Sequence, residues 1–554
     1  MNADLLIFLS EGIVIAWIIM RSREKSKSAS RLSSRSSVPI FRSTGRFNDI
    51  LLCAAAALLI AVTMSLIRWP VPRVHDEFSY LLAGDTFANG RLANQPHPFW
   101  VHFETMHVLQ QPHYASKYPP VQGLFLAIGQ RVFGIPIAGI WLSTSIAAAS
   151  VCWMLQGWTR RRWALFGGLA TALHHGIQLH WGQTFMGGAP ALIGSAIFFG
   201  SWARWWKISS ARNAATAAIG LSILANTRPF EGLLVSVPVC LAVVASVFRK
   251  PRGASARSAV LSLVPAAGIL LITMTCMMAY NKAITDSPFR LPYSLHSEQY
   301  MSGPLFLWQS PVVNAPEYRN ETMREFHSDW ELDAYLAQQS VAGFLRVKAH
   351  YLIDVLTVIF SPGLLLAAFI GGYCKRKSSD PRLRLIGFSL TILLGVLSAV
   401  WLFPHYIAPA FPLFMILFVQ GIRTSVAARR DWSRFRPDTL RLVVMTALLF
   451  LGIRCGLHSL QPPKGWAESR AEIISRLMQI PGNDLVIVHY GKSHSPHDEW
   501  VYNGAEIDKA PIVWARDLGE DKNRALIQYF QSRRIWSLNA DDILPELVNL
   551  SDTN

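Results

Sequence analysis

Charged residues are scarce in this chain of 554 residues: they make up 16% of it, whereas 51% of the residues are hydrophobic. Soluble domains carry about 25% charged residues, so the composition excludes a chain built only of soluble domains. Negative charges are fewer than positive ones: 35 Asp and Glu residues stand against 52 Lys and Arg residues, which gives a net charge of +17. The basic residues are spread over short segments without a nucleic-acid-binding motif, so we expect no nucleic-acid partner.

Cysteine is scarce as well, and no two cysteines have the spacing of a metal site or of a disulfide framework. Each lies in or beside an apolar run, where a cysteine acts as a small buried hydrophobic residue. The six are Cys53, Cys152, Cys240, Cys276, Cys374 and Cys455. The sequence also lacks an internal repeat, although many transporters are built from repeats.

What the sequence does have is a series of apolar runs, many of them near the length of about 20 residues that crosses a bilayer. Basic clusters occupy alternate loops, as the positive-inside rule predicts for cytoplasmic loops. We therefore predict an α-helical polytopic membrane protein with about 12 transmembrane helices and both termini outside the cytoplasm. The predicted spans lie near residues 5–20, 49–68, 136–156, 163–180, 187–204, 212–227, 232–248, 258–280, 349–372, 385–403, 406–422 and 440–457.

Three regions follow from this pattern. Residues 1–48 are predicted to form an N-terminal helix and a basic cytoplasmic loop. Residues 49–458 are predicted to form a transmembrane module with long outer loops at 69–135 and 281–347. Residues 459–554 are expected to form a soluble domain on the outer face.

The tail carries the pattern of a small α/β domain. Leu485–Tyr490 and Pro511–Arg516 are short apolar runs of the kind that form buried strands. Asn523–Arg534 has apolar residues at helical spacing. Strands and a helix within one short segment predict a sheet with the helix packed on one of its faces.

Two charged elements flank the first outer loop. The pair Asp76–Glu77 follows the second span, and Lys117 stands before Pro119 and Pro120, where the chain returns to the membrane. Charged groups at that depth are costly unless they face a polar cavity. Transfer of a sugar from a lipid phosphate needs a carboxylate to take the acceptor proton and cations to neutralise the departing phosphate. A solvated pair of loop carboxylates is the alternative interpretation.

The arrangement of Asp76–Glu77, then Lys117 with the two prolines about forty residues later, then an apolar run, resembles the first outer loop of the GT-C superfamily of membrane glycosyltransferases. Protein O-mannosyltransferases and lipid A aminoarabinose transferases belong to it. The resemblance implies that Asp76, with Glu77, is catalytic and that Lys117 contacts the donor phosphate. It also matches Tyr80 to the tyrosine that follows the acidic pair. The match covers residues 73–135, and elsewhere only the layout agrees.

This loop departs from the GT-C pattern at two positions. Ser116 stands where the relatives usually have Glu, and Tyr118 is inserted between Lys117 and the prolines. We include Tyr118 among the substrate-binding candidates. The relatives often carry an acidic residue in a later outer hairpin, and the stretch 182–189 here has none. The departures leave metal use and the identity of the donor undecided.

Two further segments carry polar residues at the outer ends of predicted spans. Arg228 and Glu231 flank Pro229 in a helix break, which favours a role facing a cavity. An interfacial turn with a snorkelling arginine is the alternative. His405 and Tyr406 follow a proline at another span end, where a substrate contact and a helix break with interfacial aromatics fit equally well.

Glu104 and His107 are the candidates for metal ligands. Their spacing of three residues could place both on one helix face. A divalent ion could stabilise a leaving phosphate, while loops rich in His and aromatic residues also serve simply as sugar platforms.

Together these features predict transfer of a sugar from a polyprenyl-phosphate-linked donor to a lipid, glycan or protein acceptor, with inversion of the anomeric centre. The reaction would take place at the outer face of a bacterial inner membrane, in contact with membrane lipid. The alternative is a transporter or flippase, or a non-catalytic binder, of a lipid-linked glycan. Charges at the outer boundary favour the enzyme, because transporters place ionisable groups near mid-membrane.

Overall fold

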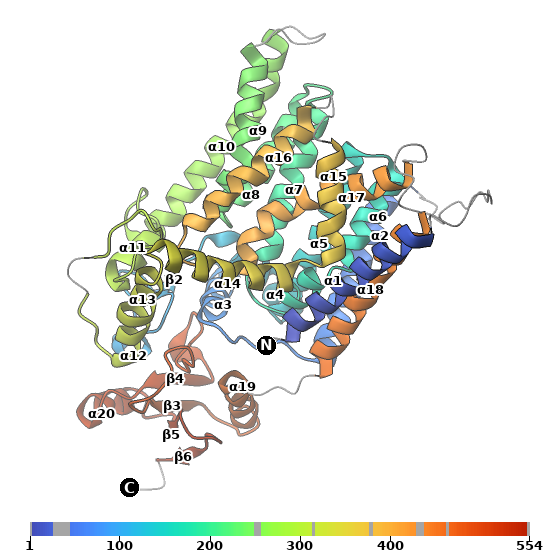
Figure 1. Cartoon of the computed structure of the whole chain (residues 1–554). Helices are drawn as coiled ribbons and strands as arrows, with labels where there is room; N and C mark the ends of the chain where they lie inside the picture. The colour runs from blue at the N-terminus through green and yellow to red at the C-terminus, as the bar shows by residue number, and fades with distance from the viewer. Residues whose placement is uncertain are drawn as a thin grey trace.

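The computed structural model describes residues 3–25, 45–248, 256–312, 316–375, 381–427, 437–460 and 465–550. A bundle of helices makes up most of the described chain, and a small unit with a four-stranded sheet lies at one end of it (Figure 1). The predicted basic loop at 21–47 falls largely outside the described residues. The side chain of Cys374 and parts of three other predicted basic loops also fall outside them.

The apolar runs form helices, because backbone polar groups in a bilayer must be satisfied within their own segment. A helix lies at each of the twelve predicted spans, although several of these spans are interrupted. The helices at these positions are α1 (Ala3–Lys25), α2 (Arg46–Ile67), α5 (Ile137–Trp158), α6 (Arg161–Ala172), α7 (Gly188–Trp205), α8 (Ala211–Ala225), α9 (Pro229–Phe248), α10 (Ala256–Thr285), α15 (Pro362–Lys375), α16 (Pro381–Leu393), α17 (Phe411–Ala427) and α18 (Pro437–Leu460).

Four helices among the described residues are both long and apolar enough to cross a membrane. They are Arg46–Ile67, Ile137–Trp158, Ser258–Thr285 and Pro404–Arg423. Three shorter apolar helices cover Leu5–Ile18, Pro229–Ala245 and Met445–Leu457. The coarse architecture is therefore mostly helical with several membrane-length helices, and the number of twelve spans stays a prediction.

The segment predicted as one straight span over 349–372 is bent sharply within its length. α14 (Val341–Ile359) and α15 meet at an angle of 100°. Pro362 explains the break, since a proline disfavours the helical conformation of the residue before it and cannot donate a backbone hydrogen bond. The predicted span 163–180 is also interrupted, because α6 ends at Ala172 and a π-helical turn follows at Gly176–Trp181.

Short elements form the two long outer loops. The first loop holds α3 (His75–Ala88), a 3-10 turn at Trp100–Phe103, the hairpin β1 (Val108–Leu109) and β2 (Ala115–Ser116), and then α4 (Pro120–Phe133). The second holds α11 (Pro292–Tyr300), α12 (Glu321–Arg324), a π-helical turn at Glu325–Trp330 and α13 (Glu331–Leu336).

The C-terminal unit is a sheet with strand order β4-β3-β5-β6, in which β3 runs parallel to both neighbours. The strands predicted at 485–490 and 511–516 are confirmed, while the predicted helix begins and ends a few residues earlier than expected. The elements are α19 (Trp466–Leu477), β3 (Asp484–His489), β4 (Ile512–Arg516), α20 (Glu520–Tyr529), β5 (Arg534–Asn539) and β6 (Leu547–Asn549).

Both faces of this sheet are buried, but against different partners. Leu485 and Ile487 pack in one apolar cluster with Phe78 and Leu82 of α3. Val486 and Val488, which point the other way on β3, pack with α19. One face of the sheet therefore shares its core with the helix that begins at His75.

Close packing of α15 against α17 gives a test of the bundle. A Cβ atom on Gly421 would lie 1.9 Å from the carbonyl oxygen of Ala367, so no side chain fits there. We expect Gly421→Ala to lower the free energy of unfolding by about 1–3 kcal/mol, as other overpacked sites do. Thermal unfolding in detergent micelles measures it. Gly387→Ala on α16 is the control, because nothing lies within 4 Å of that position; equal melting of the two variants would contradict this packing.

Candidate active site

One cavity of about 460 Å³ is lined by six of the residues that the sequence analysis singled out. They are Tyr80, Lys117, Tyr118, Arg228, Glu231 and Tyr406. The rest of the lining is mainly aromatic and apolar and includes Tyr280, Tyr293 and Trp401. The structure therefore brings together residues that lie more than 300 positions apart in the chain.

Prolines set the backbone around the cavity. Pro119 and Pro120 begin α4, where a missing N–H is tolerated, and this fixes the segment that carries Lys117. Pro229 begins α9 in the same way beside Arg228. The backbone N–H of Val121 donates to the carbonyl of Asn226 over 3.2 Å, so the two proline-bounded segments are joined directly.

Asp76 reaches the cavity through Tyr118. The Tyr118 hydroxyl donates a short hydrogen bond to Oδ1 of Asp76, and the Tyr118 ring stacks on Tyr80 with centroids 4.5 Å apart. The other carboxylate oxygen, Oδ2, lies 3.9 Å from Nε2 of His107. The Asp76 side chain keeps 28% of its surface exposed, so it can still receive a partner.

Lys117 is almost completely buried, with 2% of its surface exposed. Its ammonium donates to Nδ1 of His107 over 2.7 Å and lies 4.6 Å from the centre of the Tyr293 ring. Burial lowers the pKa of Lys117 to about 8, although the carboxylates of Glu331 and Asp76 act in the opposite direction. At neutral pH the side chain is therefore still largely a cation.

Arg228 is the second cation of the cavity. Its guanidinium lies 4.8 Å from the centre of the Tyr406 ring. Among the residues that the structure describes, its buried Nε has no hydrogen-bond partner. Glu231 also lines the cavity, but no ion pair joins it to Arg228 within 4.0 Å in the described part of the chain. Arg228 therefore has unused donor capacity at the cavity wall.

Glu77 does not join Asp76 at the cavity. Its buried carboxylate accepts backbone N–H groups from Arg73 over 2.8 Å, from Val74 over 3.3 Å and from Phe185 over 2.9 Å. These bonds fix the start of α3 and connect it to the turn before α7. The predicted role as a second catalytic carboxylate is not supported by this geometry, because both oxygens are used by the backbone.

His405 is buried but does not line the cavity. Its ring lies between Phe403 and Tyr406, with centroid distances of 5.8 and 4.9 Å. Of the predicted pair, only Tyr406 faces the cavity. His405 instead packs behind Tyr406.

Glu104 and His107 do not share a helix face, contrary to the expectation. The 3-10 turn ends at Phe103, and His107 has a positive φ of 62°. Glu104 accepts from Tyr300 over 3.2 Å and from Asn320 over 3.3 Å, away from the His107 ring. Within the described ranges, no group of three or more His, Cys, Asp or Glu side chains is placed to hold a metal ion.

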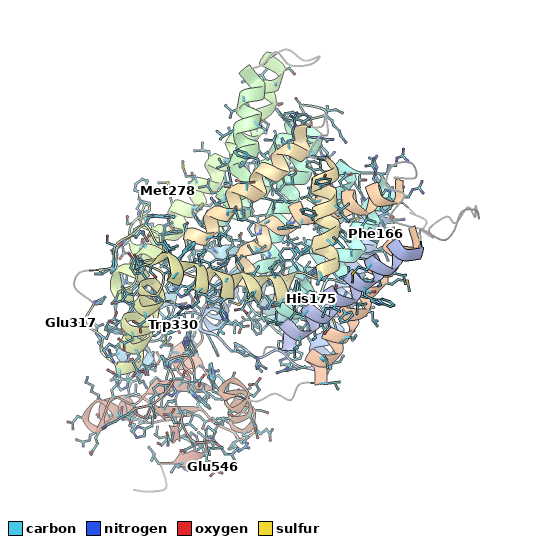
Figure 2. All side chains as sticks on the ribbon, viewed as in Figure 1. Phe166, His175, Met278, Glu317, Trp330 and Glu546 are labelled. Atoms are coloured by element: carbon cyan, nitrogen blue, oxygen red, sulfur yellow. The ribbon has the colours of Figure 1, made fainter. Side chains whose placement is uncertain are left out.

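The C-terminal unit contributes contacts that the sequence analysis missed. Tyr502 and Nδ1 of His75 form a hydrogen bond of 2.7 Å, although the residues are 427 positions apart. The ring centroids of His497 and Trp330 lie 4.8 Å apart. Figure 2 labels Trp330 on the side of the bundle that faces the sheet. The only local feature in the sequence is a run rich in His and acidic residues at 489–499, which contains His497. The unit therefore packs directly against the residue before Asp76.

No protein-family model matches the chain, and no curated protein matches it in sequence. Solved structures do match. The oligosaccharyltransferase of Archaeoglobus fulgidus in its apo form superposes with a TM-score of 0.50 at 12% identity, over 90% of this chain and 70% of the archaeal one. ArnT from Cupriavidus metallidurans matches with a TM-score of 0.49 at 13% identity, over 89% of this chain and 93% of that chain.

These structural neighbours are glycosyltransferases of the GT-C superfamily. The resemblance seen in the first outer loop is thus confirmed at the level of the fold, which the archaeal structure shares over nearly the whole chain. Several apolar helices among the described residues are long enough to cross a membrane, in agreement with a multi-pass membrane protein.

A buried ion pair within the C-terminal unit holds the arginine that bonds the unit to the outer loops. Glu499 binds Arg516, whose guanidinium also donates to Oγ1 of Thr322 over 3.0 Å. We expect Glu499→Gln to destabilise this attachment by about 3–5 kcal/mol, because it leaves the arginine charge buried without its partner. Faster hydrogen exchange in α12 and β4 would report it. Glu520→Gln is the control, since that exposed carboxylate pairs with Arg524 at the surface; equal exchange in both variants would contradict the role of the pair.

Proposed function

We propose that this chain transfers a sugar from a polyprenyl-phosphate-linked donor to a lipid, glycan or protein acceptor at the outer face of the membrane, with inversion at the anomeric carbon. One observation carries the proposal: Lys117 and Arg228 face the same cavity, and Asp76 joins it through Tyr118. A sugar phosphate needs cations at its phosphate and a base near its anomeric carbon.

The cations would hold the phosphate. Lys117 and Arg228 have donors available, and charge-assisted hydrogen bonds to a phosphate are stronger than neutral ones. As the bond from the anomeric carbon to the phosphate oxygen breaks, its electron pair leaves with the phosphate. The two positive charges stabilise the negative charge that develops there.

Asp76 would act as the general base. The acceptor hydroxyl attacks the anomeric carbon from the face opposite the phosphate and gives its proton to the carboxylate. Bond formation and bond breaking on opposite faces in one step invert the configuration. Tyr118 holds Oδ1 of Asp76 by its hydrogen bond, while Oδ2 has no hydrogen bond among the described residues, with His107 at 3.9 Å, and can take the acceptor proton. Glu77 positions this machinery by fixing the start of α3.

Tyr80, Tyr118, Glu231 and Tyr406 would contact the sugar and the phosphate from the cavity wall. The prenyl chain would leave along α10, which supplies Met277 to the lining. Leu271 and Ile272 on this helix are exposed, at 59% and 64%, as a lipid-facing surface requires. In Figure 1, α9 and α10 extend beyond the rest of the bundle.

The proposal includes the membrane topology. Twelve spans with both termini outside place the cavity and residues 459–554 on the outer side of a bacterial inner membrane. The shared core of Leu485 with Phe78 supports this, since the C-terminal unit must then lie on the same side as the loop that carries Asp76. The boundaries at 48 and 458 follow from the same charge pattern.

We expect Asp76→Asn to slow sugar transfer by about 10²–10⁴-fold, the usual contribution of a general base. The assay uses purified protein in proteoliposomes and a panel of radiolabelled hexosyl and pentosyl polyprenyl phosphates. Asp286→Asn is the control, because that carboxylate is 67% exposed and pairs with His113 outside the cavity.

Near-normal transfer by folded Asp76→Asn would reject Asp76 as the base. Donor binding by the wild-type protein without any transfer would instead identify a binder or flippase of lipid-linked glycans.

The lowered pKa of Lys117 predicts the pH dependence of donor use. The side chain is a cation below about pH 8, so kcat/KM should fall as the pH rises through about 8. In Lys117→Arg this alkaline fall should move out of range, because the pKa of arginine exceeds about 12, even if the overall rate is lower. An alkaline fall at the same pH in both proteins would show that another group causes it.

A further inference from the structure

His107 lies between Lys117 and Asp76, the residues that we propose as a phosphate contact and as the base. Its Nδ1 lies 2.7 Å from the ammonium of Lys117, and its Nε2 lies 3.9 Å from Oδ2 of Asp76. The ring is buried, so neither nitrogen is mainly solvated by bulk water. One imidazole therefore faces the cation with one nitrogen and the carboxylate with the other.

The hydrogen-bond chemistry assigns the tautomer. An ammonium group only donates, so Nδ1 must accept from Lys117 and cannot carry a proton. Burial, followed by the charge of Lys117, holds the pKa of His107 well below its ordinary value, so the ring is neutral. The remaining proton is then on Nε2, which points toward Asp76. The ring thus presents an acceptor to the cation and a donor to the base.

The backbone holds His107 in an uncommon conformation. Its φ of 62° lies in the left-handed region, which histidine visits more often than most residues but which still costs free energy. The hydroxyl of Ser79 on α3 donates to the His107 carbonyl over 2.7 Å and keeps this residue in place. Ser79 follows Asp76 by three residues on the same helix, so the base and the ring are fixed by one element.

We infer that His107 is a positioning residue that holds Lys117 and Asp76 in one array, accepting from the cation at Nδ1 and directing its Nε2–H at the carboxylate. The inference rests on the proposed function for the roles of Lys117 and Asp76. It assigns His107 a role in sugar transfer in place of the metal-ligand role considered from the sequence.

The other groups that face His107 favour its neutral form. The rings of His75, His296 and His327 surround it, with centroids of His75 and His296 at 5.8 and 5.9 Å. Lys117 faces Glu331 as well as Asp76, and Glu331 accepts from His327 over 2.7 Å. A second positive charge on His107 would therefore lie among a cation and three imidazoles, which disfavours protonation.

Two substitutions separate the two contacts. In His107→Asn the amide oxygen takes the position of Nδ1 and can still accept from Lys117, but nothing reaches Asp76. In His107→Gly both contacts are lost. Asn and Gly both tolerate a positive φ, so neither variant adds backbone strain.

We expect both variants to lower kcat by about a hundredfold, because Asp76 loses its alignment. Only His107→Gly should also change Lys117. Without its acceptor, the Lys117 cation loses a charge-assisted hydrogen bond. The pH midpoint of Lys117 acylation should therefore fall by about one unit. The pH dependence of Lys117 acylation by acetic anhydride, read by mass spectrometry, measures this without any sugar donor.

His113→Gly, in the same loop but paired with Asp286, is the control and should leave both readouts unchanged. Wild-type kcat in both His107 variants would overturn the inference, as would equal shifts of the acylation midpoint in His107→Asn and His107→Gly. If the wild-type protein transfers no sugar, the proposed function fails, while the acylation midpoint still decides whether His107 holds Lys117.

Discussion

The cavity buries two cations, Lys117 and Arg228, and among the described residues no carboxylate forms an ion pair with either of them within 4.0 Å. Moving an ion out of water costs several kcal/mol, and buried charges are normally paired. Here Lys117 donates to a neutral imidazole, and Arg228 lies over an aromatic ring with a buried Nε that has no partner among the described residues. An arriving phosphate would supply the missing negative charge. The rest of the site can be understood as the framework that keeps these two cations in place.

That framework links the bundle to the C-terminal unit. α3 carries Asp76, and its opposite side supplies Phe78, whose ring stacks on Tyr502 with centroids 4.1 Å apart. The same helix is anchored at its start by Glu77, which accepts from the backbone N–H groups of Arg73 before the helix and of Phe185 before α7. Asp76, which we propose as the base, therefore sits on a helix held by the sheet on one side and by the turn before α7 on the other. Catalytic geometry within a fraction of an ångström requires this kind of support.

The sequence allowed the local and periodic features to be predicted. Long apolar runs located the helices, and short apolar runs located β3 and β4. Both signals depend only on residues that are neighbours in the sequence. Lys117, Arg228 and Glu231 share one cavity, since charge at a membrane boundary is costly enough to be informative by itself.

The features that sequence reasoning missed depend on distant contacts. The break between Ile359 and Pro362 has a local signal in the proline, which was overridden by the apolar run around it. Glu77 and Asp76 are adjacent and identical in charge, and only the fold shows that Glu77 binds backbone N–H groups whereas Asp76 accepts from Tyr118. The bond of His75 with Tyr502 spans the chain, so no local pattern could reveal it. Likewise, three-residue spacing predicted a shared helix face for Glu104 and His107, where the chain leaves the 3-10 turn and turns again at His107.

The central claim is that the cavity beside Asp76 is built for a lipid-borne phosphate. Electron cryo-microscopy of the protein in lipid nanodiscs with a bound polyprenyl phosphate tests it most directly. The account predicts phosphate density in contact with both Lys117 and Arg228, on the same side of the membrane as Asp76 and the C-terminal sheet. Phosphate bound elsewhere, or a bilayer position that places Asp76 on the cytoplasmic side, would contradict it.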